Sequence, residues 1–105
     1  MLVIDRNDGR GISFPGGLAW PWENSEACAR REVSEETGLE VTSAVQLFEY
    51  HSTAEIPVRV TVFAMEIAGE LKDSWEGAPV WLPLSEIQAR LLPSQKEIPE
   101  RLQRG

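Results

Sequence analysis

Three glutamates lie close together in the segment RREVSEETG, which runs from Arg30 to Gly38. If this segment is helical, Glu35 and Glu36 fall about 60° and about 40° to either side of Glu32, so the three carboxylates share one narrow stripe. Each like-charge pair at this spacing costs about 0.2 to 0.5 kcal/mol on an exposed helix. Hard divalent cations such as Mg2+ take carboxylate oxygens as ligands, so a metal site would offset the repulsion.

The acidic stripe is also consistent with roles that need no metal. Arg31 lies four residues before Glu35 and can neutralise one carboxylate. A solvated acidic face on a surface helix is a common origin of such a short charge pattern, and the triplet alone favours it. A purely structural acidic surface that contacts a basic protein partner is a third interpretation.

The elements that would position the stripe can be read from the local sequence. Asn24 or Ser25 can cap a helix that ends at Gly38, where glycine readily adopts the left-handed conformation common at helix ends. Two β-rich segments follow this helix and are expected to pair with each other. They are residues 41–50 and 58–67.

Shorter elements complete the expected order. Three further strands are expected at residues 2–5, 12–14 and 80–82. Ser85 and Gln88 form the Ser-x-x-Gln pattern of a capping box that would open a second helix. Trp81 is expected in the core. The order β, β, α, β, β, β, α predicts an α/β fold with a mixed sheet flanked by helices.

The composition bounds the class of protein. The chain has 105 residues, which suits one domain over residues 1–105, and no stretch approaches the roughly 20 apolar residues of a membrane span. Its net charge of −7, from 17 acidic and 10 basic residues, argues against binding to nucleic acids or to anionic membrane surfaces. The single cysteine and single histidine, Cys28 and His51, argue against zinc chemistry, and the lone cysteine fits a cytoplasmic location.

The spacing around the stripe resembles that of a known family. Five residues separate Gly17 from Glu23, and seven separate Glu23 from Arg31. The 23 residues 17–39 therefore resemble the Nudix box, GX5EX7REUXEEXGU with U aliphatic, and every specified position matches. These positions are Gly17, Glu23, Arg31, Glu32, Val33, Glu35, Glu36, Gly38 and Leu39.

The resemblance implies a fold and an activity. The fold would be a Nudix-like α/β/α sandwich with a mixed β-sheet, in which the first strand is missing or shortened. The activity would be that of a pyrophosphohydrolase, which hydrolyses a phosphoanhydride bond in a nucleoside diphosphate linked to another group. Its substrate would be a nucleoside triphosphate or a nucleotide sugar such as ADP-ribose. The alternative is a Nudix-like module that binds a nucleotide without cleaving it.

The resemblance also implies roles for single residues. The implied metal is Mg2+ or Mn2+, held by Gly17, Glu32, Glu35 and Glu36. Among the implied catalytic residues, Glu32 would be a ligand or the base that activates water. Arg31 would orient the glutamates, and Glu23 would support the cluster.

A second set of acids competes with Glu32 for the role of base. Some members of the family use a base outside the box, in a late loop. Here the corresponding candidates are Glu55, Asp73 and Glu76. Each of them is also readily explained as an ordinary solvated loop acid.

Two tryptophans stand at variable positions of the box. Trp20 replaces an acidic residue, and Trp22 a glycine, that many members of the family carry. Either indole could stack on a nucleobase, which makes Trp20 and Trp22 the expected substrate-binding residues, or both could cover the edge of the helix and core. The expected partner is a small nucleotide. The sheet edge left by the missing strand would be covered by a second copy in a homodimer, or by sequence upstream of Met1.

Overall fold

The computed structural model describes residues 1–54, 57–74 and 77–104. Its elements follow the expected order, with a short 3-10 helix and a further α-helix at the end of the chain. They are β1 (Leu2–Arg6), β2 (Ile12–Ser13), α1 (Ser25–Thr37), β3 (Glu40–Ser52), β4 (Val58–Ala68), β5 (Gly77–Trp81), α2 (Leu84–Arg90), η1 (Pro93–Gln95) and α3 (Glu97–Arg104).

The strands form two antiparallel sheets, with the orders β2-β1-β5 and β3-β4. A parallel bridge joins Ile12 to Leu91, which follows α2. The described strands therefore pair antiparallel in two sheets in place of one mixed sheet, and the parallel pairing is limited to this bridge. The long β3–β4 pair confirms the pairing expected for residues 41–50 and 58–67.

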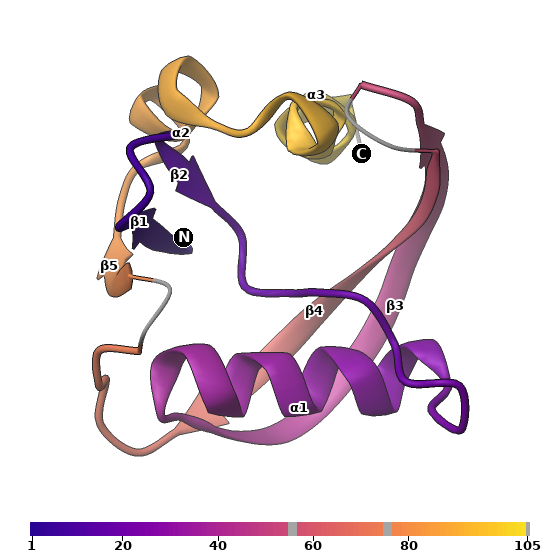
Figure 1. Ribbon diagram of the computed structural model, residues 1–105, viewed down its shortest axis with the longest axis vertical. Coiled ribbons are helices and arrows are strands. Elements are labelled where there is room, and N and C mark those ends of the chain that lie inside the picture. The colour runs from indigo at the N-terminus through magenta and orange to yellow at the C-terminus, as the bar shows by residue number, and fades with distance from the viewer. Residues whose placement is uncertain (55–56, 75–76, 105) are drawn as a thin grey trace.

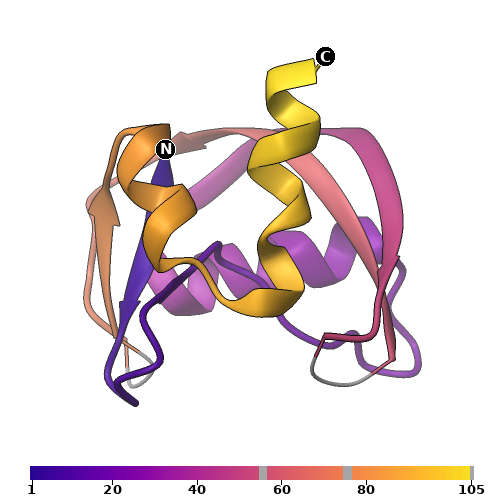
Figure 2. The ribbon, with the colours of Figure 1, turned by 90° about the horizontal axis from the view of Figure 1, so that it is seen from above.

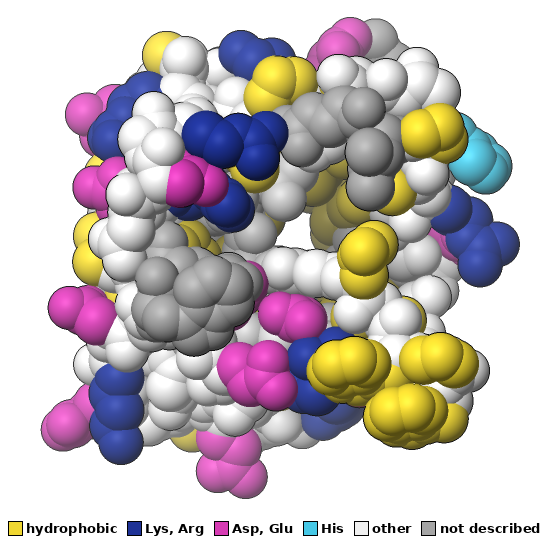
Figure 3. Space-filling view, in the orientation of Figure 1, with side chains coloured by type: hydrophobic (Ala, Val, Ile, Leu, Met, Phe, Trp, Pro, Cys, Tyr) yellow, Lys and Arg dark blue, Asp and Glu magenta, His cyan; other side chains and the backbone are white. Residues whose placement is uncertain are grey.

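Helices lie on both sides of the strands. Figures 1 and 2 show α1 on one side and α2 and α3 on the other, with the strands between them. The space-filling view shows the surface hollowed between the two sheets (Figure 3). Within residues 1–54, 57–74 and 77–104, no helix has the length and apolar character needed to cross a membrane. The arrangement of layers confirms the expected α/β/α fold.

The most deeply buried apolar cluster joins the first sheet to α2. Val3, Ile12, Ile87 and Leu91 form this cluster, and each of them is at most 3% exposed. Full burial of an aliphatic side chain contributes about 1.5 to 3 kcal/mol, so the cluster holds β2 firmly against α2. The chain leaves β2 from this anchored position toward α1, and residues 14–24 must span the distance between them.

Both ends of α1 are capped, which sets the position of the acidic stripe. Asn24 is the N-cap in place of the alternative Ser25, because its side-chain Oδ1 accepts a hydrogen bond from the backbone nitrogen of Ala27 at 2.8 Å. At the other end, Gly38 has a φ of 76° and donates to the carbonyl of Ser34 at 3.0 Å. The helix predicted from the sequence is confirmed with both of its caps.

The capping box expected for α2 is wrong. The helix begins at Leu84 with Pro83 as its N-cap, and no side chain caps it. The carbonyl of Pro83 already accepts a hydrogen bond from the backbone nitrogen of Ile87 at 3.2 Å. Ser85 therefore lies inside the first turn, where it cannot form a capping box with Gln88.

The expected core position of Trp81 is also wrong. This residue is 58% exposed and lies opposite Leu2 at the end of β5. Among the described strands, β5 is an edge strand of its sheet, and Trp81 is its last residue, where fewer neighbouring side chains can cover the indole.

Candidate active site

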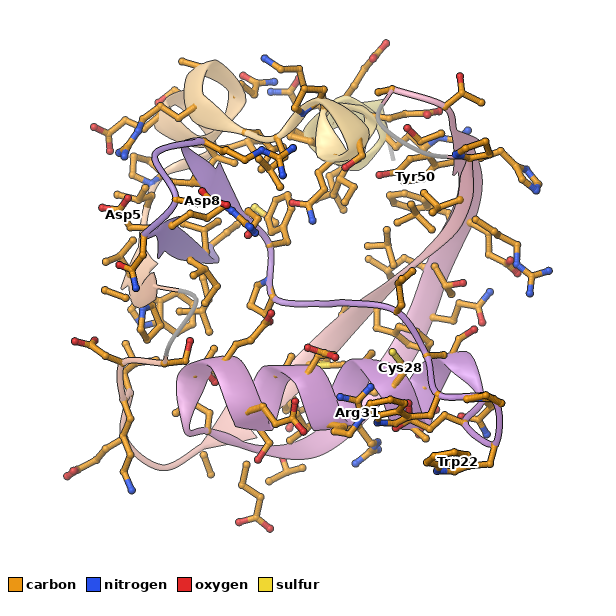
Figure 4. All side chains as sticks on the ribbon, in the orientation of Figure 1. Asp5, Asp8, Trp22, Cys28, Arg31 and Tyr50 are labelled. Carbon is orange, nitrogen blue, oxygen red and sulfur yellow. The ribbon has the colours of Figure 1, made fainter. Side chains whose placement is uncertain are left out.

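Residues 16–20, here called the strap, lie along one face of α1. The backbone N–H of Gly16 donates to Oε2 of Glu36 at 2.8 Å. Sγ of Cys28, labelled in Figure 4, donates to the carbonyl of Gly17 at 3.5 Å. Cys28 and Glu36 lie about two turns apart on the same face of the helix, so the strap is held against α1 over that length.

Glu32 lies against the strap between these two contacts. A Cβ added to Gly17 would lie 2.7 Å from Oε1 of Glu32 and 3.0 Å from its Oε2. Glycine therefore leaves room for this carboxylate beside the backbone, and any other residue would push it away. At Gly16 an added Cβ meets nothing within 4 Å, so the restriction applies to one of the two adjacent glycines.

Arg31 joins three acids. Its Nε and Nη2 donate to the two carboxylate oxygens of Glu23 at 2.7 and 3.0 Å. Its Nη1 donates to Glu32 at 2.8 Å and to Glu35 at 3.1 Å. These hydrogen bonds hold the pKa of Glu23 below its usual range and raise the pKa of Arg31. The sequence predicts one neutralised carboxylate, whereas Arg31 pairs with three.

The three glutamates of the stripe differ in exposure. The side chain of Glu35 is 58% exposed and that of Glu32 is 13% exposed, whereas Glu36 is buried. The stripe therefore crosses from the buried edge of α1 to solvent. In the part of the chain that the structure describes, no three His, Cys, Asp or Glu side chains are gathered closely enough to hold a metal ion. Glu32 and Glu35 accept hydrogen bonds from Arg31, and Glu36 accepts one from Gly16 of the strap.

Trp20 and Trp22 stack on each other beside Arg31; Figure 4 labels Arg31 and Trp22. The two ring centroids are 5.7 Å apart with an angle of 5° between the planes, and Cζ of Arg31 lies 5.2 Å from the centroid of Trp20. Trp20 is 50% exposed and Trp22 is 79% exposed. Neither indole is buried, and Figure 3 shows apolar side chains gathered at this corner of the surface.

One of the three loop acids can be located. Glu55 and Glu76 lie outside the described residues, and Asp73 is exposed. Asp73 follows Lys72, whose backbone N–H donates to the carbonyl of Thr37 at 2.7 Å. The loop that carries Asp73 therefore passes the C-terminal end of α1.

Sequence reasoning misses two contacts of the strap. One is the hydrogen bond from Gly16 to Glu36, and the other is the contact of the Cys28 thiol with the carbonyl of Gly17. Burial raises the pKa of Cys28, which keeps the thiol protonated and able to donate. The pair of glycines after Pro15 is a signal for the first contact, and nothing comparable in the sequence indicates the second.

Residues 1–102 match the family model described as the NUDIX domain. A segment of 48 residues is 44% identical to a Bacillus subtilis (strain 168) protein named "Putative 8-oxo-dGTP diphosphatase YtkD". This match covers 46% of the chain and 30% of that protein, so the chain matches less than a third of the length of its relative.

Solved structures share the fold. The solution structure of the E. coli ORF135 protein has a TM-score of 0.81 at 23% identity, and the match covers 98% of this chain and 79% of that chain. The NUDIX domain of Shewanella oneidensis NrtR, solved as a complex with ADP ribose, has a TM-score of 0.77 at 16% identity, with 98% of this chain and 75% of that chain covered. Likeness at these identities concerns the fold alone. Because the family model matches residues 1–102, the chain belongs to the NUDIX domain family.

Proposed function

We propose that the protein is a metal-dependent pyrophosphohydrolase, which cleaves a phosphoanhydride bond in a nucleoside diphosphate linked to another group. The observation that carries the proposal is the arrangement around Arg31, whose guanidinium hydrogen-bonds Glu23, Glu32 and Glu35. Membership of the NUDIX domain family and the similarity to a protein named as an 8-oxo-dGTP diphosphatase support it.

The proposed metal is Mg2+ or Mn2+. Glu32, Glu35 and Glu36 offer the carboxylate oxygens that hard divalent cations prefer, and the carbonyl of Gly17 offers a further oxygen. The absence of a side chain at Gly17 suits this set, because a Cβ there would collide with Glu32. The residues thus fit a hard cation by donor chemistry. A bound ion would neutralise charge on the diphosphate and lower the pKa of a water molecule.

The remaining residues would position the acids and accept the proton. Glu23 binds two nitrogens of Arg31, and this fork holds the guanidinium toward Glu32 and Glu35. Glu32 would accept the proton of the attacking water, since its largely buried side chain lies at the strap. The loop acids Glu55, Asp73 and Glu76 are the alternative bases, and Asp73 lies on the loop beside the end of α1.

Two similar proteins bear on the substrate class that we propose. The name of the curated relative specifies 8-oxo-dGTP, and the NrtR domain was solved with ADP ribose. Both molecules carry a diphosphate between a nucleoside and another group, and cleavage of such a linkage depends on groups that position and neutralise phosphate oxygens. Nucleoside triphosphates, including oxidised ones, and nucleotide sugars such as ADP-ribose are therefore the proposed class.

A panel of nucleoside diphosphate derivatives assayed with Mg2+ and with Mn2+ tests this function. We expect hydrolysis that stops when EDTA removes the metal and resumes when Mg2+ is restored. Nucleotide binding without hydrolysis would identify a binding module instead. Calorimetry that detects neither stoichiometric Mg2+ binding nor nucleotide binding would support a structural acidic surface that contacts a basic protein.

We further propose that two copies associate and that the protein works in the cytoplasm. Val45 and Leu47 of β3 are 63% and 45% exposed, and β3 pairs with β4 alone among the described strands. Association through this sheet would cover these apolar side chains. A fully active monomer in light scattering would contradict the dimer.

The proposed cytoplasmic location is supported by Cys28, which is buried and forms no disulfide, as is usual in a reducing compartment.

A further inference from the structure

The tryptophan pair extends from a turn that is held at both ends. The backbone N–H of Glu23 donates to the carbonyl of Trp20 at 2.9 Å, and the N–H of Trp20 donates to Oε1 of Glu23 at 2.8 Å. Pro21 stands at the second position of this turn, where its fixed φ restricts the backbone further. Because Glu23 also binds the fork of Arg31, the turn is anchored to α1.

The two indoles are not equivalent within the stack. Trp20 lies between Arg31 and Trp22. Its ring centroid is 5.2 Å from Cζ of Arg31 and 5.7 Å from the ring centroid of Trp22. Trp22 stacks on Trp20 with one face and is 79% exposed. Trp20 is therefore the inner layer, and the other face of Trp22 is the open end of the stack.

We propose that the open face of Trp22 is the surface on which the nucleobase of the substrate stacks. Trp20 then acts as a spacer that connects this surface to Arg31 and the acids. This inference rests on the proposed function, and it replaces two equivalent substrate-binding tryptophans with one stacking residue and one positioning residue.

The chemistry of the surroundings favours a nucleotide as the occupant. Trp20 and Trp22, which are 50% and 79% exposed, form an exposed aromatic pair, and exposed apolar surface of this kind is a feature of ligand-binding sites. The parallel rings present a flat surface, which suits a planar heterocycle. At the inner end of the stack, Arg31 binds the acids proposed to hold the metal. A nucleotide has a group that suits each end of the stack: a flat base for Trp22 and a diphosphate for the metal site proposed beside Arg31.

Steady-state kinetics of Trp22→Leu test the proposal, with Trp81→Leu as the matched control. Trp81 is also an exposed indole, 58% exposed, but it belongs to β5, which lies at the left in Figure 1, whereas Figure 4 labels Trp22 at the lower right in the same orientation. We expect Trp22→Leu to raise KM for 8-oxo-dGTP or ADP-ribose by about 5- to 150-fold, the value of one base-aromatic stack, while kcat stays unchanged. The inhibition constant of inorganic triphosphate, which has no base, should not change. Trp22→Phe should retain most of the affinity.

Fluorescence provides a readout that does not require catalysis. Titration with dGMP, which retains a purine base, should quench tryptophan emission in the wild-type protein and in Trp81→Leu, and should fail to do so in Trp22→Leu. Inorganic phosphate should have no effect on any of the three proteins. Circular dichroism confirms that each variant is folded.

The outcomes separate this inference from the proposed function. If nucleotides are hydrolysed and Trp22→Leu leaves KM within twofold of wild type, the function stands and the stacking role is wrong. An equal rise in the inhibition constant of triphosphate would also overturn it, because the effect would not concern the base. If Trp22→Leu abolishes self-association and leaves KM unchanged, the exposed indole contacts a second copy of the chain and the stacking role is wrong. If no nucleotide is hydrolysed but dGMP quenches the emission of the wild-type protein and not that of Trp22→Leu, the stacking role stands and the proposed hydrolase function is wrong.

Discussion

Gly17 and Glu32 are so close that a methyl group on Gly17 would lie 2.7 Å from the carboxylate oxygen Oε1. Gly17→Ala should therefore displace the Glu32 side chain, which is more easily moved than the backbone of the strap. Misplacement of a catalytic group by about 1 Å can cost about 100-fold in rate, so we expect kcat/KM to fall by about 10- to 100-fold. Hydrolysis of the best substrate in the panel measures this.

Gly16→Ala is the control for this prediction. It adds the same methyl group one residue earlier, where nothing lies within 4 Å. Its kcat/KM should stay within about threefold of wild type, and both variants should unfold at similar temperatures because neither glycine has a left-handed φ. Equal loss of activity in the two variants would contradict a specific role for the contact between Gly17 and Glu32.

Arg31→Lys keeps a positive charge but removes the planar fork. A lysine ammonium is a compact point charge and cannot reproduce the two hydrogen bonds to Glu23 while also binding Glu32 and Glu35. We expect kcat/KM to fall by about 10- to 100-fold, as for groups that orient metal ligands. The matched control is Arg30→Lys, in which an exposed pair with Glu26 is altered. Comparable losses in both variants would show that helix charge, and not the fork, is responsible.

Glu36→Gln should abolish metal binding with little effect on folding. The amide oxygen of glutamine can still accept the hydrogen bond from Gly16, but it lacks the charge of the proposed ligand. A metal contributes several kcal/mol to such a reaction, so turnover should fall by at least about 100-fold. Glu26→Gln, on the exposed first turn of α1, should retain wild-type turnover. A folded Glu36→Gln protein with an unchanged rate would remove Glu36 from the metal site.

Tyr50 should make stability depend on alkaline pH. Burial raises the pKa of Tyr50 from 10.0 to about 12, and its hydroxyl donates to the carbonyl of Ser94 at 2.9 Å. The folded state holds this proton more tightly, so the contribution to stability is complete below pH 10 and is lost as the pH rises toward 12. Below pH 10, Tyr50→Phe should lower the free energy of unfolding by about 1 kcal/mol.

Urea denaturation at pH 8, 10 and 11 measures that difference. The gap between wild type and Tyr50→Phe should narrow as the pH rises, since the wild-type protein alone loses the contribution of the protonated hydroxyl. A gap that stays constant from pH 8 to pH 11 would mean that Tyr50 titrates normally.

Features that depend on neighbouring residues were predictable from the sequence. The caps Asn24 and Gly38 use hydrogen bonds within four residues, so their local types suffice to indicate them. The Ser85 cap fails because Pro83 is the N-cap, so the helix begins two residues earlier, and residue types alone do not rank these two start positions. The hydrogen bonds of Arg31 with Glu23 depend on how the turn of residues 20–23 lies against α1, which no helical period encodes.

The guanidinium of Arg31 is a counterion that the chain itself supplies to the acids. Folding around these acids therefore need not depend on binding of the proposed metal ion. The bonds of Arg31 to three carboxylates neutralise part of the repulsion within the chain itself. The acid cluster can therefore assemble without an external cation, unlike the small zinc domains that are unfolded until metal binds. A divalent ion bound at the proposed site would then stabilise an already folded protein, by an amount that rises with the logarithm of the ratio of its concentration to the dissociation constant.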